Sequence, residues 1–391
     1  MIVRAPVVLA MDGPPIANGA VAVRGGTIVG VGKYPEIAKS FGGPVADLDG
    51  HVLMPGLINA HCHLDYTLLR RAISPRKSFT EWIKRINAVK SALCDEDYLT
   101  GITRGFDALK RWGTTTVLNI ESFPGLLSKL PVPPIRTWWF HEWIDLRHPP
   151  ERHLYKLPKG WLGGVGVSPH APYTASAKMY LKARKSGKLV TTHLAESSEE
   201  QAMFRDASGP LFEFLKSIGR PMRDCGHGPI VTEMFRRRLI GPGTILAHVN
   251  EVEDDEFPLL RGLHIVHCPR SHAYFGHRHF AWKRLRDAGA NLCLGTDSLA
   301  SNDSLSLFAE MQKLAENEPS LRPQEILAAA TVNAALALGE AGRLGVLRKG
   351  AFADMIAVPC DAKPAASVAA VVAYNKRVPW MHLGGVRTRE A

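Results

Sequence analysis

The sequence lacks several features that mark common classes of protein. Its six cysteines include no C-x-x-C pair, which argues against a disulfide framework and favours reduced thiols. No apolar run approaches the length of a membrane span, and the first segment meets Asp12, Pro14 and Pro15 before any signal-type hydrophobic core forms. We therefore expect a cytoplasmic protein that does not bind membranes.

The charge distribution also lacks the pattern of a nucleic-acid-binding protein. Lys and Arg outnumber Asp and Glu by 48 to 37, for a net charge of +11, but basic clusters such as 182–188 and 236–238 fall on expected helices or loops. Neither a basic stripe interleaved with aromatic residues nor a known nucleic-acid module is apparent. We expect solvated surface charge and a small-molecule ligand, with an anionic substrate as an open alternative.

The middle of the chain shows a long alternation of strands and helices. Expected strands lie at 53–63, 113–120, 135–144, 162–170, 189–196, 244–250, 264–272 and 291–298. Expected helices lie between or after most of them, at 79–93, 96–112, 197–217, 254–261 and 280–288, followed by 304–315 and 323–338. This rhythm predicts a (β/α)8 barrel over residues 54–345.

Both ends of the chain are instead rich in short strands and turns. Gly25 and Gly26 separate two β-branched runs, which predicts a tight hairpin. Residues 346–391 contain further strand–turn–strand patterns, including an expected extended segment at 367–375. We expect residues 1–53 and 346–391 to pair into one small β domain.

The segment 54–65, MPGLINAHCHLD, is the one around which the chain is organised. His61 and His63 follow a hydrophobic run, 51–57, that is typical of a buried strand. Residues two apart on a strand point to the same face, so both imidazoles can converge on one point, as a zinc site requires. On spacing alone, a pair of hydrogen-bonded histidines at a strand end is an equal alternative.

Other expected barrel strands also end in polar residues. Barrel enzymes place their catalytic groups at the carboxyl ends of the strands. The fifth to eighth strands end respectively in His193 and Glu196, in His248, in Arg270, Ser271 and His272, and in Asp297. So many polar strand ends favour one shared site over a set of unrelated structural residues.

The set His61, His63, His193 and Asp297 suits one Zn²⁺ or Fe²⁺, because it supplies three nitrogens and a carboxylate. Such a metal would lower the pKa of a bound water, and Asp297 would accept its proton. His248 would hold the resulting hydroxide or polarise the electrophile. Glu196 would pass a proton to a ring nitrogen of a bound heterocycle. The fourth strand contains no lysine to bridge two metals, so a single metal is expected.

These residues resemble the amidohydrolase superfamily, in its cytosine deaminase and chlorohydrolase-like branch. The matching segments span nearly the whole chain in order: PGLINAHCHLD, SPHAPYTAS, TTHLAES, ILAHVN, CPRSH, LGTDSLASN, TVNAALALG and GRLGVLRKGAFADM. The resemblance implies a distorted (β/α)8 barrel with a small β-sandwich domain formed by both termini. It also implies the metal ligands, the proton shuttle Glu196 and the role of His248 near the hydrolytic water.

Within this branch the sequence is most similar to deaminases of methylthioadenosine and S-adenosylhomocysteine and of aminodeoxyfutalosine. The resemblance implies release of ammonia from an aminopurine nucleoside by attack of a metal-bound hydroxide. It implies that His170, in SPHAPY, meets the purine and that the segment around Trp82 shapes the pocket wall. Arg270 and His272 are expected as further substrate contacts, although much of the branch has Asn where this chain has His272.

The substrate is harder to predict. In methylthioadenosine deaminases a Glu further along the segment that contains this Trp holds the ribose hydroxyls, but here the stretch from Trp82 to Ser91 contains none. Basic residues at 70–71 and 76–77 would suit a carboxylate tail, as aminodeoxyfutalosine has, although solvated loop charges are an equal alternative.

We therefore favour an aminodeoxyfutalosine-like substrate and zinc rather than iron. The alternatives are a methylthioadenosine, S-adenosylhomocysteine or other aminated-heterocycle deaminase, a chlorohydrolase, and a non-catalytic barrel. A homodimer is an open possibility.

Overall fold

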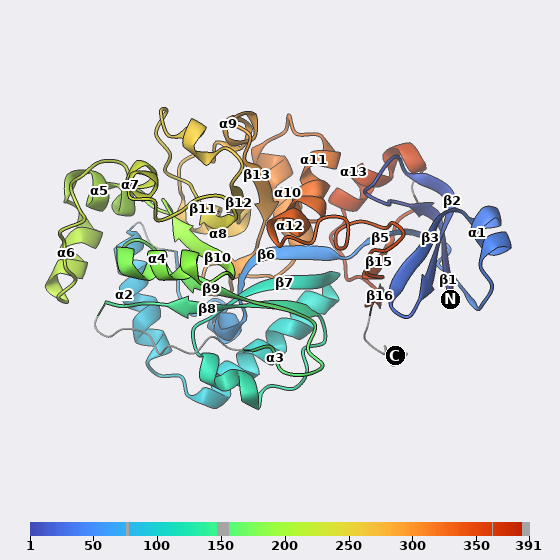
Figure 1. Ribbon diagram of the computed structural model, residues 1–391, viewed down its shortest axis with the longest axis horizontal. Coiled ribbons are helices and arrows are strands. Elements are labelled where there is room, and N and C mark those ends of the chain that lie inside the picture. The colour runs from blue at the N-terminus through green and yellow to red at the C-terminus, as the bar shows by residue number, and fades with distance from the viewer. Residues whose placement is uncertain (76–77, 147–155, 362, 385–391) are drawn as a thin grey trace.

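The computed structural model describes residues 1–75, 78–146, 156–361 and 363–384. A barrel sheet lies beside a second sheet built from both ends of the chain (Figure 1). The strands of the barrel are parallel and run in the order β13-β12-β11-β10-β9-β8-β7-β6-β14. Their bounds are β6 (Leu57–His63), β7 (Thr114–Glu121), β8 (Arg136–Trp143), β9 (Gly163–Pro169), β10 (Leu189–Leu194), β11 (Thr244–His248), β12 (His264–His267), β13 (Asn291–Leu294) and β14 (Asp297–Ser298).

The last expected strand closes the ring in two pieces. β13 pairs with β12, and β14 pairs with β6 at Cys62 and His63. Between the two pieces, Thr296 N donates a hydrogen bond to His61 O at 3.1 Å. Gly295 is required at the bend, because a Cβ there would lie 2.8 Å from the Cβ of His61. The expected distorted barrel is confirmed, and each of its eight predicted strands is present.

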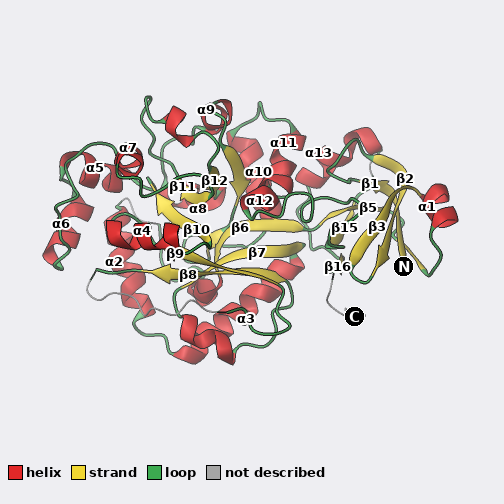
Figure 2. Ribbon diagram, viewed as in Figure 1, coloured by secondary structure: helices red, strands yellow, loops and turns green. Residues whose placement is uncertain are grey.

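Helices cover the outside of the barrel and its ends (Figure 2). Their bounds are α2 (Phe79–Lys90), α3 (Asp95–Arg111), α4 (Ala177–Lys185), α5 (Ser198–Asp206), α6 (Pro210–Ser217), α7 (Ile230–Arg236), α8 (Pro269–Phe275), α9 (Trp282–Asp287), α10 (Leu307–Asn317), α11 (Pro323–Ala329) and α12 (Val332–Ala337). Short 3-10 segments are η1 (Leu64–Leu69), η2 (Pro124–Lys129) and η3 (Phe257–Leu260). In the part of the chain that the structure describes, no helix has the length and apolar character to cross a membrane.

Two of the expected helices are divided, and one is much shorter than predicted. The predicted helix at 197–217 becomes α5 and α6, because Ala207 and Gly209 adopt positive φ values of 50° and 93°. The predicted helix at 323–338 becomes α11 and α12, separated at Thr331, whose φ and ψ of −137° and −94° are not helical. Only η3 forms within 254–261.

The second sheet combines strands from both ends of the chain. Its strands are β1 (Ile2–Val8), β2 (Ile16–Arg24), β3 (Thr27–Lys33), β4 (Val45–Asp47), β5 (His51–Pro55), β15 (Met355–Pro359) and β16 (Trp380–His382), accompanied by α1 (Tyr34–Ser40), η4 (Pro364–Ala366) and α13 (Ser367–Val372). β5 pairs with β1 on one side and with β15 on the other, so both termini contribute to one sheet. Gly25 and Gly26, with φ of 57° and 78°, form the predicted hairpin turn between β2 and β3.

The prediction of an extended segment at 367–375 is wrong, because most of it forms α13. Val368, Val371 and Val372 are buried, and their spacing of three and four residues places them on one helix face. That face packs beside α10 and α11 of the barrel. The β-branched composition favoured a strand, but burial against two helices favours the helical spacing.

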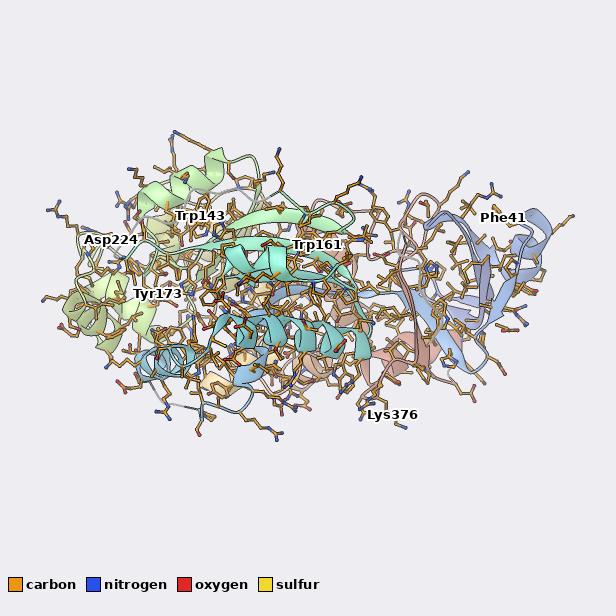
Figure 3. All side chains as sticks on the ribbon, turned by 90° about the horizontal axis from the view of Figure 1, so that it is seen from below. Phe41, Trp143, Trp161, Tyr173, Asp224 and Lys376 are labelled. Atoms are coloured by element: carbon orange, nitrogen blue, oxygen red, sulfur yellow. The ribbon has the colours of Figure 1, made fainter. Side chains whose placement is uncertain are left out.

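The hydrophobic run 51–57 does not form one strand. β5 belongs to the terminal sheet and β6 to the barrel, and Gly56 between them has no room for a side chain, since a Cβ would lie 2.0 Å from Thr115 Oγ1. β6 therefore begins beside the terminal sheet, and its carboxyl end points away from it. In Figure 3, Phe41 and Asp224 lie toward opposite ends of the molecule.

A buried ion pair joins the barrel to the C-terminal segment. Arg136, at the start of β8, donates through Nε to Asp354 Oδ2 at 2.9 Å and through Nη2 to Gly384 O at 3.1 Å. Its guanidinium lies 4.0 Å from the ring centroid of Phe352. Removing one partner of such a pair leaves a buried charge without compensation. The expected domain boundaries themselves stay a prediction.

We expect Asp354→Ala to lower the free energy of unfolding by about 3–5 kcal/mol, because the Arg136 charge would stay buried. Asp47→Ala is the matched control: it removes the exposed Arg4–Asp47 pair and should cost about 0–1 kcal/mol. Urea denaturation followed by circular dichroism measures both changes. Equal, small losses for the two variants would contradict a structural role for the buried pair.

Candidate metal and substrate site

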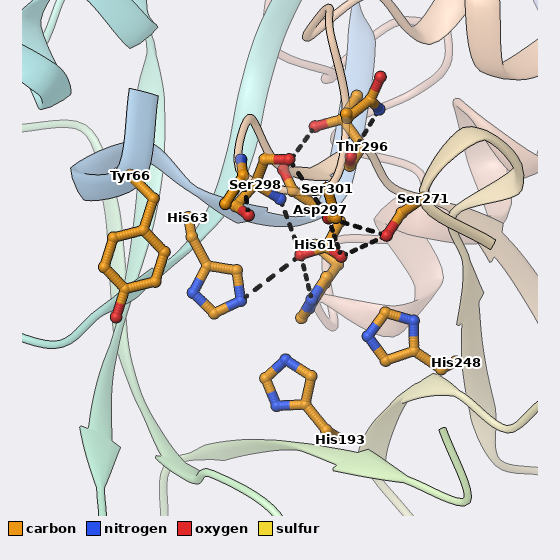
Figure 4. A network of polar contacts seen from close by, with 12 residues as sticks. His61, His63, Tyr66, His193, His248, Ser271, Thr296, Asp297, Ser298 and Ser301 are labelled. Atoms are coloured by element: carbon orange, nitrogen blue, oxygen red, sulfur yellow. Dashed lines mark hydrogen bonds and ion pairs between the residues drawn. The ribbon is translucent and has the colours of Figure 1, made fainter. Parts of the chain in front are cut away.

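Four histidines and one aspartate meet at the carboxyl ends of the barrel strands (Figure 4). His61 and His63 lie in β6, His193 lies in β10, His248 ends β11, and Asp297 begins β14. Asp297 Oδ1 lies 3.8 Å from His61 Nε2 and 3.9 Å from His63 Nε2. The ring of His193 lies 4.9 Å from that of His61 and 5.3 Å from that of His248. The structure thus brings the predicted ligand set together.

The imidazoles of this cluster present unpaired nitrogens. Among the described residues, the buried Nε2 atoms of His61 and His248 have no hydrogen-bond partner. His193 contacts the His170 carbonyl oxygen through Nδ1 at 2.8 Å, which makes Nδ1 the donor and leaves Nε2 with its lone pair. Burial lowers the pKa of His63 to about 4, and burial with the neighbouring imidazoles lowers that of His61. Neutral buried imidazoles without partners fit a divalent metal.

Asp297 is held so that one oxygen faces the histidines. Its Oδ2 accepts hydrogen bonds from Ser271 Oγ at 2.7 Å and from Ser301 Oγ at 2.9 Å. Burial raises the pKa of Asp297. His248, His63 and the Ser271 hydroxyl lower it by a larger amount, so the net shift of the pKa is downward. Asp297 also has a φ of 57°, a strained backbone conformation that aims the carboxylate into the cluster. We did not predict Ser301, although it follows Asp297 by four residues in LGTDSLASN.

Glu196 lies next to His248 at the edge of the cluster. Its Oε1 is 3.6 Å from His248 Nε2. Its backbone is fixed because its N donates to Glu200 Oε2 at 2.8 Å and its O accepts from Asn250 Nδ2 at 2.9 Å. Burial first, and then the charges of Asp297 and Glu200, raise the pKa of Glu196 well above its ordinary value. A carboxyl group of this kind can carry a proton near neutral pH.

A cavity of about 310 Å³ connects this cluster to the helices at the barrel mouth. The structure places both His170 and Trp82 in its wall, together with most of the cluster: His63, His193, Glu196, His248 and Asp297. The remaining wall is mainly apolar: α2 contributes Phe79, Ile83 and Ile86, and α6 with the residue after it contributes Phe214, Leu215 and Ile218. The cavity is therefore an apolar slot with polar groups at defined positions, as expected for a small-molecule site.

Two predicted substrate contacts lie outside this cavity. The expected strand 264–272 ends at His267, and α8 begins at Pro269, a residue that favours the first position of a helix. Arg270 consequently pairs with Asp303 and donates to Asn302 Oδ1 at 3.0 Å. His272 contacts Asn250 Oδ1 through Nδ1 at 3.1 Å and faces a different cavity. Both side chains therefore contact residues next to the site, Asn302 and Asn250, and do not line the cavity.

The described residues of the predicted basic loop do not line this cavity. Residues 76–77 lie outside the described part of the chain, Arg70 is exposed, and Arg71 lines a separate cavity. Lys90 of α2 lines the cavity instead, as does Glu142 near the end of β8. Sequence reasoning missed both residues. Lys90 follows Trp82, Ile83, Ile86 and Asn87 at helical spacing, and this pattern was a signal that could have located it.

Comparison with known proteins identifies the family. The model of the amidohydrolase family matches residues 52–126 and 147–378, and the chain belongs to this family of C–N-hydrolysing enzymes, as predicted. The chain is 30% identical over 376 residues to a 5-methylthioadenosine/S-adenosylhomocysteine deaminase of Syntrophobacter fumaroxidans, covering 89% of this chain and 81% of that protein. It is 29% identical over 387 residues to a 5'-deoxyadenosine deaminase of Methanosarcina mazei, covering 92% and 84%.

Solved structures show the same fold. Helicobacter pylori aminofutalosine deaminase, in complex with methylthio-coformycin, superposes with a TM-score of 0.82 at 19% identity, covering 98% of each chain. An adenosine deaminase from Xanthomonas campestris with bound zinc superposes with a TM-score of 0.80 at 23% identity, covering 98% of this chain and 91% of the other.

We expect His193→Ala and Asp297→Ala to lose most of their bound metal, because each removes a ligand atom from the cluster. Glu196→Gln is the control: it keeps the size of the side chain and all four proposed ligands, so it should retain the metal content of the wild type. Elemental analysis of the purified proteins measures this. Full metal occupancy in both ligand variants would contradict the proposed ligand set.

Proposed function

We propose that this protein is a metal-dependent hydrolytic deaminase that releases ammonia from an aminopurine nucleoside. The observation that carries this proposal is the placement of Glu196 beside the histidine cluster at the end of an apolar cavity. The cavity suits a flat ring, the cluster suits a divalent metal, and a carboxyl group with a raised pKa can protonate a ring nitrogen. The deaminases among its relatives support the same reaction class.

We propose that His61, His63, His193 and Asp297 hold the metal and that this metal is zinc, as found in the Xanthomonas campestris deaminase. When bound, such an ion lowers the pKa of a coordinated water towards neutrality. Ser271 and Ser301 donate to Asp297 Oδ2, and Ser298 N donates to Oδ1 at 2.7 Å. Oδ1 is the oxygen that faces the histidines, so in this proposal it accepts the proton from the attacking water. The apolar wall limits the access of other water molecules to the reacting carbon.

Glu196 and His248 act on the heterocycle in this proposal. Glu196, in its protonated form, donates to the ring nitrogen beside the amino-bearing carbon, which makes that carbon more electrophilic. The hydroxyl group of the resulting adduct gives its proton back to Glu196, which passes it to the amino group, so that the C–N bond breaks, a C=O bond forms and ammonia leaves. The proton that Asp297 accepted from the water then restores the protonated form of Glu196. His248, 3.6 Å from Glu196, is placed to orient the attacking water and to stabilise the charge that develops there.

Ammonia release from zinc-reconstituted protein tests the function. We expect turnover of aminopurine nucleosides (aminodeoxyfutalosine, methylthioadenosine and adenosine) in preference to the free bases guanine and cytosine. Glu196→Gln should bind metal and lose about 100- to 10,000-fold in kcat, because it removes the proton shuttle. Silence of the zinc-loaded wild type on every nucleoside would refute the proposal, and wild-type activity in Glu196→Gln would refute the shuttle.

Among nucleosides we favour one with an anionic substituent, of the aminodeoxyfutalosine type. Among the described residues that line the cavity, Lys90 is the only Lys or Arg. Its Nζ donates to the Tyr66 hydroxyl and lies 4.4 Å from that ring's centroid. An ammonium group carries three donors, so further hydrogen bonds remain available for a carboxylate.

We expect Lys90→Met to raise KM for aminodeoxyfutalosine about tenfold or more, with a smaller change in kcat, because a charge-assisted hydrogen bond is lost. KM for the uncharged methylthioadenosine should change much less. Lys84→Met on the same helix is the control, since Lys84 pairs with Glu81 at the surface and does not line the cavity. Steady-state kinetics of both variants on both substrates measure these changes. An equal rise in KM for the two substrates in Lys90→Met would argue against recognition of the substrate's carboxylate by Lys90.

A further inference from the structure

Glu142 presents an unused acceptor to the cavity. It lies near the carboxyl end of β8, and its side chain is only 7% exposed although it lines the cavity wall. Its Oε2 accepts a hydrogen bond from Ser122 Oγ at 2.7 Å. Its Oε1 has no hydrogen-bond partner among the described residues, and it lies 3.9 Å from His170 Nε2. A nearly buried carboxylate oxygen without a donor is costly, so a ligand that supplies a donor would be favoured here.

The hydrogen bonds behind Glu142 fix the orientation of its carboxylate. Lys90 can only donate, so the Tyr66 hydroxyl accepts from it and turns its own hydrogen to Ser122 Oγ, 2.9 Å away. Ser122 in turn donates to Glu142 Oε2. This chain connects a cation to an anion through two hydroxyl groups and leaves Oε1 as the outward acceptor.

The chemistry of a purine nucleoside limits what can meet this acceptor. This step rests on the proposed function. In an aminopurine nucleoside the bare ring nitrogens are acceptors, and the amino group is the one lost at the metal cluster. The hydroxyl groups of the sugar are the donors that remain.

Glu142 also lies at a suitable place along the wall. His170 stands between it and the cluster, with its ring 4.8 Å from that of His193. We propose that Glu142 is a specificity-determining residue whose Oε1 accepts a hydrogen bond from a sugar hydroxyl of the nucleoside substrate. A carboxylate at this position selects nucleosides that carry the hydroxyl over deoxy analogues that lack it.

Kinetics on adenosine, 2'-deoxyadenosine and 3'-deoxyadenosine test the proposal in zinc-loaded protein. The wild type should lose about 10- to 100-fold in kcat/KM on the analogue that lacks the bound hydroxyl. In Glu142→Gln, KM for adenosine should rise and that discrimination should fall to about threefold or less, because a charged acceptor becomes a neutral amide. Glu213→Gln, an exposed change on α6, is the matched control and should keep the wild-type ratios.

A second variant at the same position keeps the test valid if Glu142→Gln does not fold. Glu142→Asp keeps the charge but withdraws the oxygens from the cavity, and it should lose discrimination as Glu142→Gln does. Equal discrimination in wild type and in a folded, metal-containing Glu142→Gln would overturn the proposal. A Glu142 effect that depends on a 2-amino group on the base, instead of on the sugar, would overturn it too. Absence of ammonia from every nucleoside with wild-type enzyme would instead refute the deaminase function itself.

Discussion

The structure depends on bringing several neutral imidazoles and one carboxylate to a single buried point. Buried nitrogens without partners are costly, and a metal ion removes that cost. His61 and His63 converge because residues two apart on a strand face the same side, here of β6. Closure of the barrel supplies the rest, because pairing of β14 with β6 sets Asp297 beside them at the expense of a strained backbone.

The two ends of the cavity differ in the environment of their ionisable side chains. At the end with the histidine cluster, burial lowers the pKa of His63 and raises that of Glu196, so that one buried carboxyl can carry a proton while Asp297 stays ionised. At the other end, the hydroxyl groups of Tyr66 and Ser122 connect Lys90 to Glu142. These differences are the basis for proposing proton transfer at one end and recognition of polar substituents at the other.

The sequence predicted the elements that depend on local periodicity. It did not predict the elements whose conformation depends on contacts with distant parts of the chain. The eight barrel strands and the clustered ligands followed from hydrophobic runs that end in polar residues. The helix at 367–372 was missed because its valines favour strands locally, and only packing against α10 and α11 makes them helical. Arg270 was misplaced because Pro269 starts a helix immediately after a short strand. Glu142 carried the same signal as the predicted site residues, a polar side chain near the carboxyl end of an expected strand, but it was overlooked.

This difference also explains why the reaction class was easier to infer than the substrate. The groups proposed to do chemistry lie at or just after the ends of β6, β10, β11 and β14, where one short motif places each of them. The groups proposed for recognition come from α2, η1, β8 and the residue after β7, and their hydrogen bonds join segments that are far apart in sequence. A single substitution on α2 or β8 can therefore change the preferred nucleoside while every proposed ligand of the metal stays in place.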